Sequence, residues 1–243
     1  MNFLNGTRGI LLDIEGTTTP IDFVHDVLFT YARVHVRDFL FANIGSDSIR
    51  ADTDLLRQQN ELDQREGRNP PPLENENEVE SIAAYVEWLI LLDRKSTGLK
   101  SLQGKIWREG YLAGQLKSQV FADVAPALQR WHEQKLTTSI FSSGSVLAQQ
   151  LLFAHTEAGD LTHFIDNYFD TNTGLKGAAA SYRRIADTLG LAPFEILFVS
   201  DVVDELDAAD LAGMKVLLSI RPGNAPQANL KPYREIHNFL TLK

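Results

Sequence analysis

The chain has 243 residues, 44% hydrophobic and 23% charged, which is the composition of an ordinary globular protein able to bury a large core. A formal net charge of −9 argues against nucleic acid or an anionic membrane as the main partner, since both require a basic face. The absence of cysteine excludes disulfides, thiol nucleophiles and cysteine-ligated metals. Residues 1–9 lack a signal pattern and no apolar run approaches the roughly 20 residues of a membrane span, so we expect a cytoplasmic protein.

A short apolar run near the start of the chain is closed by polar residues. Residues 9–14 are Gly-Ile-Leu-Leu-Asp-Ile, and a glutamate, a glycine and three threonines follow. A run of this kind is typical of a buried parallel strand that ends in a functional loop. We therefore expect a strand over 10–14, with Asp13 and Glu15 at its carboxyl end.

The next part of the chain is dominated by helical periodicity. Apolar side chains recur at helical spacing over 23–39 and again over 79–90, which predicts amphipathic helices there. Between them, consecutive prolines at 70–72 and an acidic segment over 74–80 indicate a loop on the surface.

From residue 120 onward, short strands alternate with helices. This alternation predicts an α/β fold, a doubly wound parallel-sheet core of Rossmann-like type, with the helical segment inserted after the first strand as an α-helical cap. We place the core at 1–20 and 119–243, and the cap at 21–118. The predicted strands are 136–141, 196–199 and 216–220, and the predicted helices are 146–155, 178–189 and 203–211.

The polar residues at the predicted strand ends are the candidates for function. In open parallel sheets, ligands bind outside the carboxyl ends of the strands, where the strand order reverses. An insertion rooted beside that edge is in a position to act as a lid. The candidates at these ends are Asp13, Glu15, Ser142, Ser143 and Asp201.

Asp13 and Glu15 lie two residues apart at a strand end. An aspartate that attacks phosphorus forms an aspartyl-phosphate, which divides the transfer into two easier steps. Glu15 can then protonate the leaving oxygen and later activate the water. Gly16 permits a sharp turn, and its backbone and Thr17 can offer donors to the phosphoryl oxygens. The alternative is a strand followed by an acidic, capped loop.

Ser142 and Ser143 lie between an apolar run and a predicted helix. Hydroxyls together with backbone N–H groups at a helix start form an anion site, which predicts contacts with a phosphate. The alternative is that Ser143 or Ser145 simply caps the helix.

Asp201 ends another predicted strand, and Asp204 and Glu205 follow within one turn. Mg²⁺ prefers oxygen ligands and is usually held by one or two carboxylates plus substrate phosphate, so Asp201 suits a metal ligand. Glu205 is placed to orient Asp201 or a water. The alternative is that these acids cap a surface helix.

Lys176 lies between glycines at 174 and 177, in a flexible loop before a helix. It can neutralise phosphate charge as a point cation, and the alternative is a solvated loop lysine. The order of acid pair, hydroxyl loop, lysine and second acid pair favours a single site over separate surface features.

This order resembles the four-motif pattern of the haloacid-dehalogenase superfamily. Asp13 and Glu15 match the first motif, Ser142 the second, Lys176 the third and Asp201 the fourth. Most phosphatases of that superfamily carry aspartate where this chain has Glu15, a departure that points to one subfamily.

The run over 12–21 closely resembles the start of the enolase-phosphatases of methionine salvage. The resemblance covers nearly the whole chain and is weakest over 44–78. It continues at 99–107, 121–124, 141–145, 169–171, 200–202 and 221–225.

The resemblance implies a bifunctional enzyme that enolises 2,3-diketo-5-methylthiopentyl 1-phosphate and then hydrolyses its phosphate to give the acireductone. It implies a monomer that uses Mg²⁺, with a helical cap over the core. The implied residues are Asp13 and Glu15 for catalysis, Asp13, Glu15 and Asp201 for Mg²⁺, and Ser142, Ser143 and Lys176 for the substrate, with Thr17 and Glu205 in support.

Three alternatives stay open from the sequence. A phosphatase of another small phosphate monoester would share the core and lack the enolase step. A dehalogenase of the same superfamily would have no need of Glu15 or of an acidic metal site. A receiver-type phospho-acceptor is also doubly wound, but it lacks a large helical insertion and would hold its phosphate rather than turn over.

Overall fold

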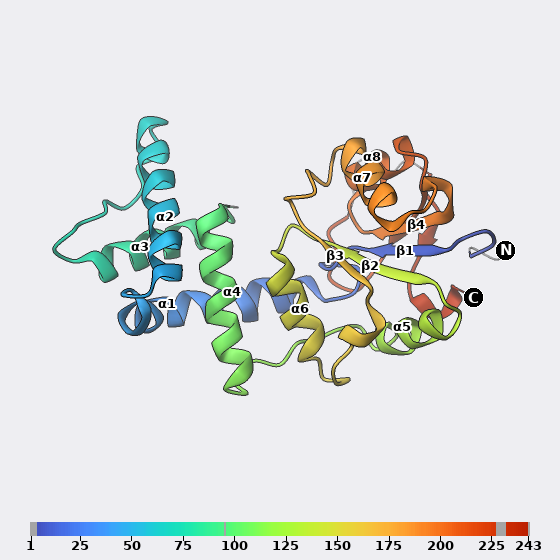
Figure 1. Ribbon diagram of the computed structural model, residues 1–243, viewed down its shortest axis with the longest axis horizontal. Helices are drawn as coiled ribbons and strands as arrows, with labels where there is room; N and C mark the ends of the chain where they lie inside the picture. The colour runs from blue at the N-terminus through green and yellow to red at the C-terminus, as the bar shows by residue number, and fades with distance from the viewer. Residues whose placement is uncertain (1–3, 95, 227–231, 243) are drawn as a thin grey trace. The chain divides into compact units, whose positions relative to one another are not determined.

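The computed structural model describes residues 4–94, 96–226 and 232–242, and it divides into two compact units (Figure 1). The sheet unit comprises Met1–Val24 and Lys117–Lys243, and the helical unit comprises His25–Leu116. The division therefore falls after Val24 and after Leu116, beside the boundaries expected after residues 20 and 118. That the helical unit acts as a cap stays a prediction.

The sheet unit contains a six-stranded parallel sheet with the order β3-β2-β1-β4-β5-β6. The chain builds outward from β1 in one direction and then returns to build outward in the other, so the strand order reverses between β1 and β4. This confirms the predicted doubly wound fold. The strands are β1 (Gly9–Leu12), β2 (Thr137–Phe141), β3 (Asn167–Phe169), β4 (Ile196–Ser200), β5 (Lys215–Ser219) and β6 (Glu235–Ile236).

Helices cover both faces of this sheet. In Figure 1, α5 (Val124–Glu133) and α6 (Val146–Ala154) lie on one face, and α7 (Ala179–Leu189) and α8 (Val203–Leu211) lie on the other. The central strands are buried on both faces, as their continuous apolar runs predict. Leu12 in β1 is in register with Ile140 in β2 and Val199 in β4, so the polar residues that follow these strands meet at one edge.

The helical unit consists of four α-helices preceded by a π-helix, Phe23–Phe29, that spans the boundary between the units. In this unit, α1 packs on α3 and α4, and α2 packs on α4. None of the helices in the described parts of the chain is long and apolar enough to span a membrane. The four helices are α1 (Thr30–Asn43), α2 (Asp47–Arg65), α3 (Glu78–Leu91) and α4 (Thr97–Leu112).

Helix α2 occupies a segment for which the sequence suggested no element. Its buried residues are mostly polar, because Asp52, Thr53, Asn60 and Asp63 are buried beside Ile49 and Leu56. A search for apolar periodicity misses such a helix, since the period is carried by polar side chains that find partners only in three dimensions.

Asp63 anchors this polar face. Its side chain is fully buried and accepts from Arg68 at 2.7 Å, from Arg94 at 2.8 Å and from the Tyr85 hydroxyl at 2.7 Å. Burial alone would raise the pKa of Asp63, but hydrogen bonds from Tyr85, Arg68 and Gln59 and the charge of Arg94 lower it below its usual value. One carboxylate therefore ties α2 to α3 and to the loops that follow both helices.

Asp63→Ala is expected to lower the free energy of unfolding by about 3 to 5 kcal/mol, because it leaves buried donors and charges without a partner. Glu61→Ala removes an exposed partner of Arg65 on the same helix and should change stability by less than about 0.5 kcal/mol. Urea unfolding followed by circular dichroism measures both. Since the pKa of folded Asp63 is depressed, its contribution is complete above the ordinary aspartate value of about 3.9 and is lost as the pH falls below that. Equal losses in the two variants would contradict the assigned role.

Candidate active site

Two aspartates follow adjacent strands at the point where the strand order reverses. Asp13 comes directly after β1 and Asp201 directly after β4, and their residues are only 4% and 7% exposed. The Asp13 N–H donates to Val199 O at 3.0 Å, which continues the ladder between β1 and β4 and fixes the backbone at the strand end. Two buried carboxylates are thus held side by side by the sheet itself.

Lys176 provides a buried cation for this edge. Its ammonium pairs with Asp13 Oδ1 and, at 2.7 Å, with Glu205 Oε2. The Tyr182 hydroxyl donates to Lys176 O at 2.7 Å and anchors the loop. Burial works to lower the pKa of Lys176, but the charges of Asp13 and Glu205 raise it above its ordinary value. Lys176 is therefore a charged member of the cluster and not a solvated loop residue.

Glu205 pairs with the lysine of the cluster. Its carboxylate accepts from Lys176 and from the Ser200 hydroxyl at 2.9 Å. That it orients Asp201 or a water stays a prediction. Burial and the charge of Asp13 raise the pKa of Glu205. Burial, followed by the charges of Asp13 and Glu205, raises the pKa of Asp201 to about 7. The pKa values of Asp201 and Glu205 rise for the same reasons: both carboxyl groups are shielded from water and both lie near other negative charges.

The charges of this cluster suit a divalent cation. Three carboxylates face one ammonium, so a cation beside Asp13 and Asp201 would relieve the repulsion that raises the pKa of Asp201. Within the described ranges, no three or more His, Asp or Glu side chains gather as a complete metal site. Mg²⁺ keeps several waters and needs only one or two carboxylates with substrate phosphate, so the aspartate pair fits it. The larger set with Glu15 stays a prediction.

The loop over residues 15–19 is a tight turn held to β1, and we call it the nucleophile loop because it follows Asp13, the predicted nucleophile. The N–H groups of residues 17, 18 and 19 all donate to Ile14 O, at 3.2, 2.9 and 2.9 Å. The Gly16 N–H donates to Thr19 O at 2.9 Å, so it is engaged within the loop rather than free for a phosphoryl oxygen. Thr17 is fully buried, which places its hydroxyl away from solvent, whereas Glu15 is partly exposed.

Gly16 is required by its backbone and by its surroundings. Its φ is +67°, a left-handed conformation, and a Cβ there would lie 2.7 Å from Asp201 Cγ and 2.8 Å from Asn224 Oδ1. The loop and the second aspartate can approach this closely only because the residue has no side chain.

The Ser142 to Ser145 segment forms the turn from β2 into α6. Ser142 is buried and its hydroxyl accepts from the Gly144 N–H at 3.1 Å, and Ser143 is partly exposed. Ser145 is the N-cap and accepts from the Ala148 N–H at 3.3 Å, which is the capping alternative. Contacts of Ser142 and Ser143 with substrate stay a prediction.

Sequence reasoning missed the residues that brace these loops. Gln149 is buried in α6 and donates to Gly144 O at 2.9 Å and to Phe169 O at 2.8 Å, which ties the serine turn to the end of β3. The sequence signal for Gln149 is a polar residue within the apolar pattern of the predicted helix over 146–155. At the end of β5 and just after it, Ser219, Arg221 and Asn224 donate to the carbonyl groups of Gly16 and Thr17.

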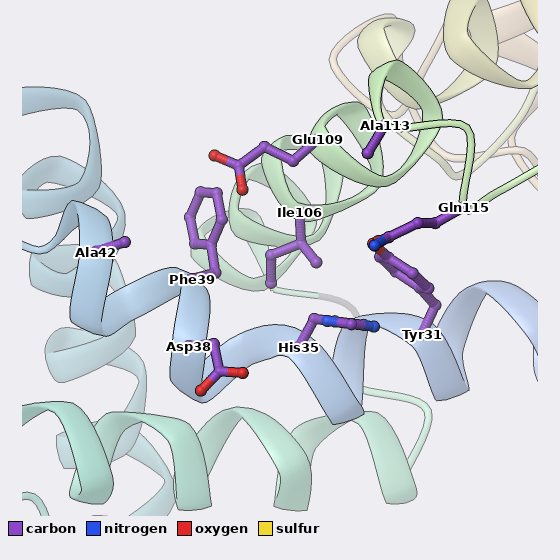
Figure 2. Close-up of a pocket in the computed structure, with 9 residues that line it drawn as sticks. All are labelled: Tyr31, His35, Asp38, Phe39, Ala42, Ile106, Glu109, Ala113 and Gln115. Atoms are coloured by element: carbon purple, nitrogen blue, oxygen red, sulfur yellow. The ribbon is translucent and has the colours of Figure 1, made fainter.

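The helical unit has a cavity of its own, of about 290 Å³, between α1 and α4 (Figure 2). The rings of Tyr31 and His35 lie in its wall with centroids 4.1 Å apart and planes tilted by 30°, and Asp38 and Glu109 contribute carboxylates. None of the residues predicted for the active site lines it.

Comparison with known families assigns the class. Residues 7–213 match the model of the haloacid dehalogenase-like hydrolases. Among solved structures, the UTR4 protein of Saccharomyces cerevisiae is similar with a TM-score of 0.78 and 36% identity, over 97% of this chain and 100% of that one. The doubly wound sheet with an aspartate after its first strand is thus the fold of a hydrolase class.

The relatives of known name narrow this further. "Enolase-phosphatase E1" of Synechococcus elongatus is 54% identical over 230 residues, which is 95% of each chain, and that of Danio rerio is 43% identical over 98% of this chain and 95% of its own. A "Probable bifunctional methylthioribulose-1-phosphate dehydratase/enolase-phosphatase E1" of Arabidopsis thaliana is 48% identical, over 96% of this chain and 47% of its own length. The chain therefore belongs to the haloacid dehalogenase-like hydrolases and, within them, to the enolase-phosphatase E1 family.

Gly16→Ala is expected to reduce phosphate-ester hydrolysis on the order of 100-fold, since the new methyl group displaces Asp201 by an ångström or so. Gly6→Ala is the matched control. Gly6 has the same φ of +67°, but a Cβ there would meet only Lys215 Nζ, at 3.8 Å. Steady-state phosphate release and urea midpoints of the two variants separate the contact with Asp201 from backbone strain. A comparable loss of activity in both would show that strain alone is responsible.

Proposed function

We propose that this chain is a Mg²⁺-dependent enolase-phosphatase of methionine salvage, which enolises 2,3-diketo-5-methylthiopentyl 1-phosphate and then hydrolyses the ester to give the acireductone. The observation that carries the proposal is a buried aspartate at the end of β1, paired with Lys176 and beside Asp201 at the end of β4. The 54% identity to an enolase-phosphatase E1 over 95% of both chains supports the two activities together.

In the phosphatase step, an Asp13 oxygen attacks phosphorus while the bond from phosphorus to the leaving oxygen breaks. Glu15 gives its proton to that oxygen, and the product leaves an aspartyl-phosphate. Water then attacks phosphorus, Glu15 takes the proton of that water, and the bond to Asp13 breaks to release phosphate. Lys176 neutralises charge beside the nucleophile, and Ser142 and Ser143 orient the phosphoryl group through hydrogen bonds.

Asp13 and Asp201 would hold the metal, with Glu15 as the third predicted ligand. When bound, Mg²⁺ supplies positive charge for the phosphoryl oxygens and a Lewis acid for the developing enolate oxygen. Enolisation and phosphate hydrolysis both place new negative charge on an oxygen atom, so a single bound cation would stabilise both. The carbon-bound proton of the enolisation is removed before any bond to phosphorus changes, so that half does not require the nucleophilicity of Asp13.

The other expected properties belong to the same proposal. The substrate is a small-molecule phosphate ester, nucleic acid and membrane are not partners, and the enzyme is a cytoplasmic monomer. The net charge of −9 supports the exclusion of polyanionic partners. Analytical ultracentrifugation tests the monomer.

Asp13→Asn is expected to lower phosphate release at least about 1,000-fold, because an amide is a poor nucleophile. The rise of enol absorbance is retained when Mg²⁺ is raised enough to offset the weaker binding by this uncharged ligand. The experiment follows enol absorbance and phosphate together on the diketo phosphate. Substantial phosphate release by the variant would refute Asp13 as the nucleophile. Wild-type protein that hydrolyses simple monoesters without forming enol would instead indicate a phosphatase that lacks the enolase step.

Asp201→Asn is expected to weaken the apparent Mg²⁺ affinity about tenfold or more, because it removes the charge of one of the three predicted carboxylate ligands. Asp204→Asn, at an exposed position in the first turn of α8, is the control and should leave the Mg²⁺ titration unchanged. Phosphate release measured over a series of Mg²⁺ concentrations gives both values. An unaltered titration in Asp201→Asn would remove this residue from the metal site.

A further inference from the structure

A buried ion pair lies next to the nucleophile loop in the sheet unit. The guanidinium of Arg221 donates from Nη1 and Nη2 to the two carboxylate oxygens of Asp123, both at 2.9 Å. The Arg221 side chain is 3% exposed and that of Asp123 is 10% exposed. The rings of Phe121 and Phe239 both pack against the guanidinium, with centroids 4.6 Å from Cζ. The pair is therefore held in the forked geometry in which arginine binds a carboxylate most tightly.

A further N–H group of Arg221 donates to the nucleophile loop. Its Nε donates to Thr17 O at 3.1 Å, and Nη1 also donates to His237 O at 3.0 Å. Asp123 Oδ2 in turn accepts from the Phe239 N–H at 2.5 Å. The pair thus connects the nucleophile loop to the last part of the chain.

The two neighbouring carbonyl groups of the loop are held as well. Gly16 O accepts from Asn224 Nδ2 at 3.0 Å and from the Ser219 hydroxyl at 3.2 Å. Thr18 O accepts from the Phe121 N–H at 3.0 Å. Three consecutive peptide groups are therefore fixed by neighbours outside the loop, and this sets the direction of the backbone immediately after the predicted acid/base glutamate.

We propose that Arg221, together with Asp123, is a positioning residue for Glu15 and so controls proton transfer to the leaving oxygen; this rests on the acid/base role proposed for Glu15 above. A buried ion pair contributes little net stability compared with apolar residues of similar size, so its geometry is the property to explain. Among side chains, only a guanidinium binds a carboxylate through two N–H groups while it donates a third N–H to a backbone carbonyl. Lysine keeps the charge and loses this geometry.

The role predicts a dependence on the leaving group. Phenyl phosphate and p-nitrophenyl phosphate differ in the basicity of the departing oxygen, and only the more basic phenolate depends strongly on a proton from the enzyme. A misplaced Glu15 should therefore impair phenyl phosphate hydrolysis and spare the nitrophenyl ester. A merely structural defect, which lowers the fraction of folded enzyme, reduces both rates by the same factor.

The test compares kcat/KM for the two esters in the wild type and in Arg221→Lys. We expect the variant to lose about tenfold or more on phenyl phosphate and less than about threefold on p-nitrophenyl phosphate. Arg130→Lys is the matched control. Arg130 lies in the same unit and donates to Phe239 O at 2.9 Å and to Leu242 O at 3.0 Å, but it makes no contact with the loop. It should change both rates by one common factor.

Several results would overturn the proposal. These are an unchanged ratio of the two rates in Arg221→Lys, or the same change of ratio in Arg130→Lys. If Arg221→Lys does not fold, Asn224→Ala decides, because it removes the donor to Gly16 O at a partly exposed position. A selective loss on phenyl phosphate then supports the positioning role, and a uniform loss or none overturns it.

Failure of the proposed function is seen separately, because neither ester is the natural substrate. Wild-type enzyme that hydrolyses both esters but forms no enol from the diketo phosphate refutes the enolase half and leaves the positioning result intact. Wild-type enzyme that releases phosphate neither from these esters nor from the diketo phosphate overturns both proposals.

Discussion

The ion pairs of Lys176 with Asp13 and Glu205 are the interactions on which the rest of the site depends. They hold one ammonium beside two buried carboxylates, Asp13 and Asp201, and the partly buried Glu205, where the sheet brings two strand ends together. Burial, together with the negative charges of Asp13 and Glu205, raises the pKa of Asp201 to about 7. A phosphate ester would add further negative charge to this place. This charge balance is the physical reason to propose a cation beside the two aspartates.

Much of the sheet unit could be predicted because its strands are buried on both faces. The predicted strands at 10–14, 136–141, 196–199 and 216–220 overlap β1, β2, β4 and β5, and the polar residue that follows each run lies at the functional edge. The short strands β3 and β6 have three and two residues, which is too few for a period to be detected. Helix α2 was missed because partners such as Arg94 for Asp63 are distant in sequence.

The candidate site also has features that the sequence predicts and features that it does not. The types and order of Asp13, Glu15, Lys176 and Asp201 are visible in the sequence because each follows a predicted strand or lies in a short loop between glycines. Which side chains meet is not visible: Glu205 pairs with Lys176 and not with Asp201 because α8 turns that residue toward the lysine loop. Such choices depend on the direction of a helix relative to a strand end, and no local pattern encodes that direction.

In the nucleophile loop, the backbone provides rigidity and the side chains provide the predicted chemistry. The N–H groups of residues 16–19 donate to Ile14 O or within the turn, and the carbonyl groups of residues 16–18 accept from β5 and from the segments around Asp123 and Arg221. A rigid backbone holds a partly exposed side chain such as that of Glu15 at a defined place without burying it. A further buried carboxylate beside Asp13 and Asp201 would increase the repulsion between like charges. A fixed loop therefore provides precision at this position without worsening the charge balance.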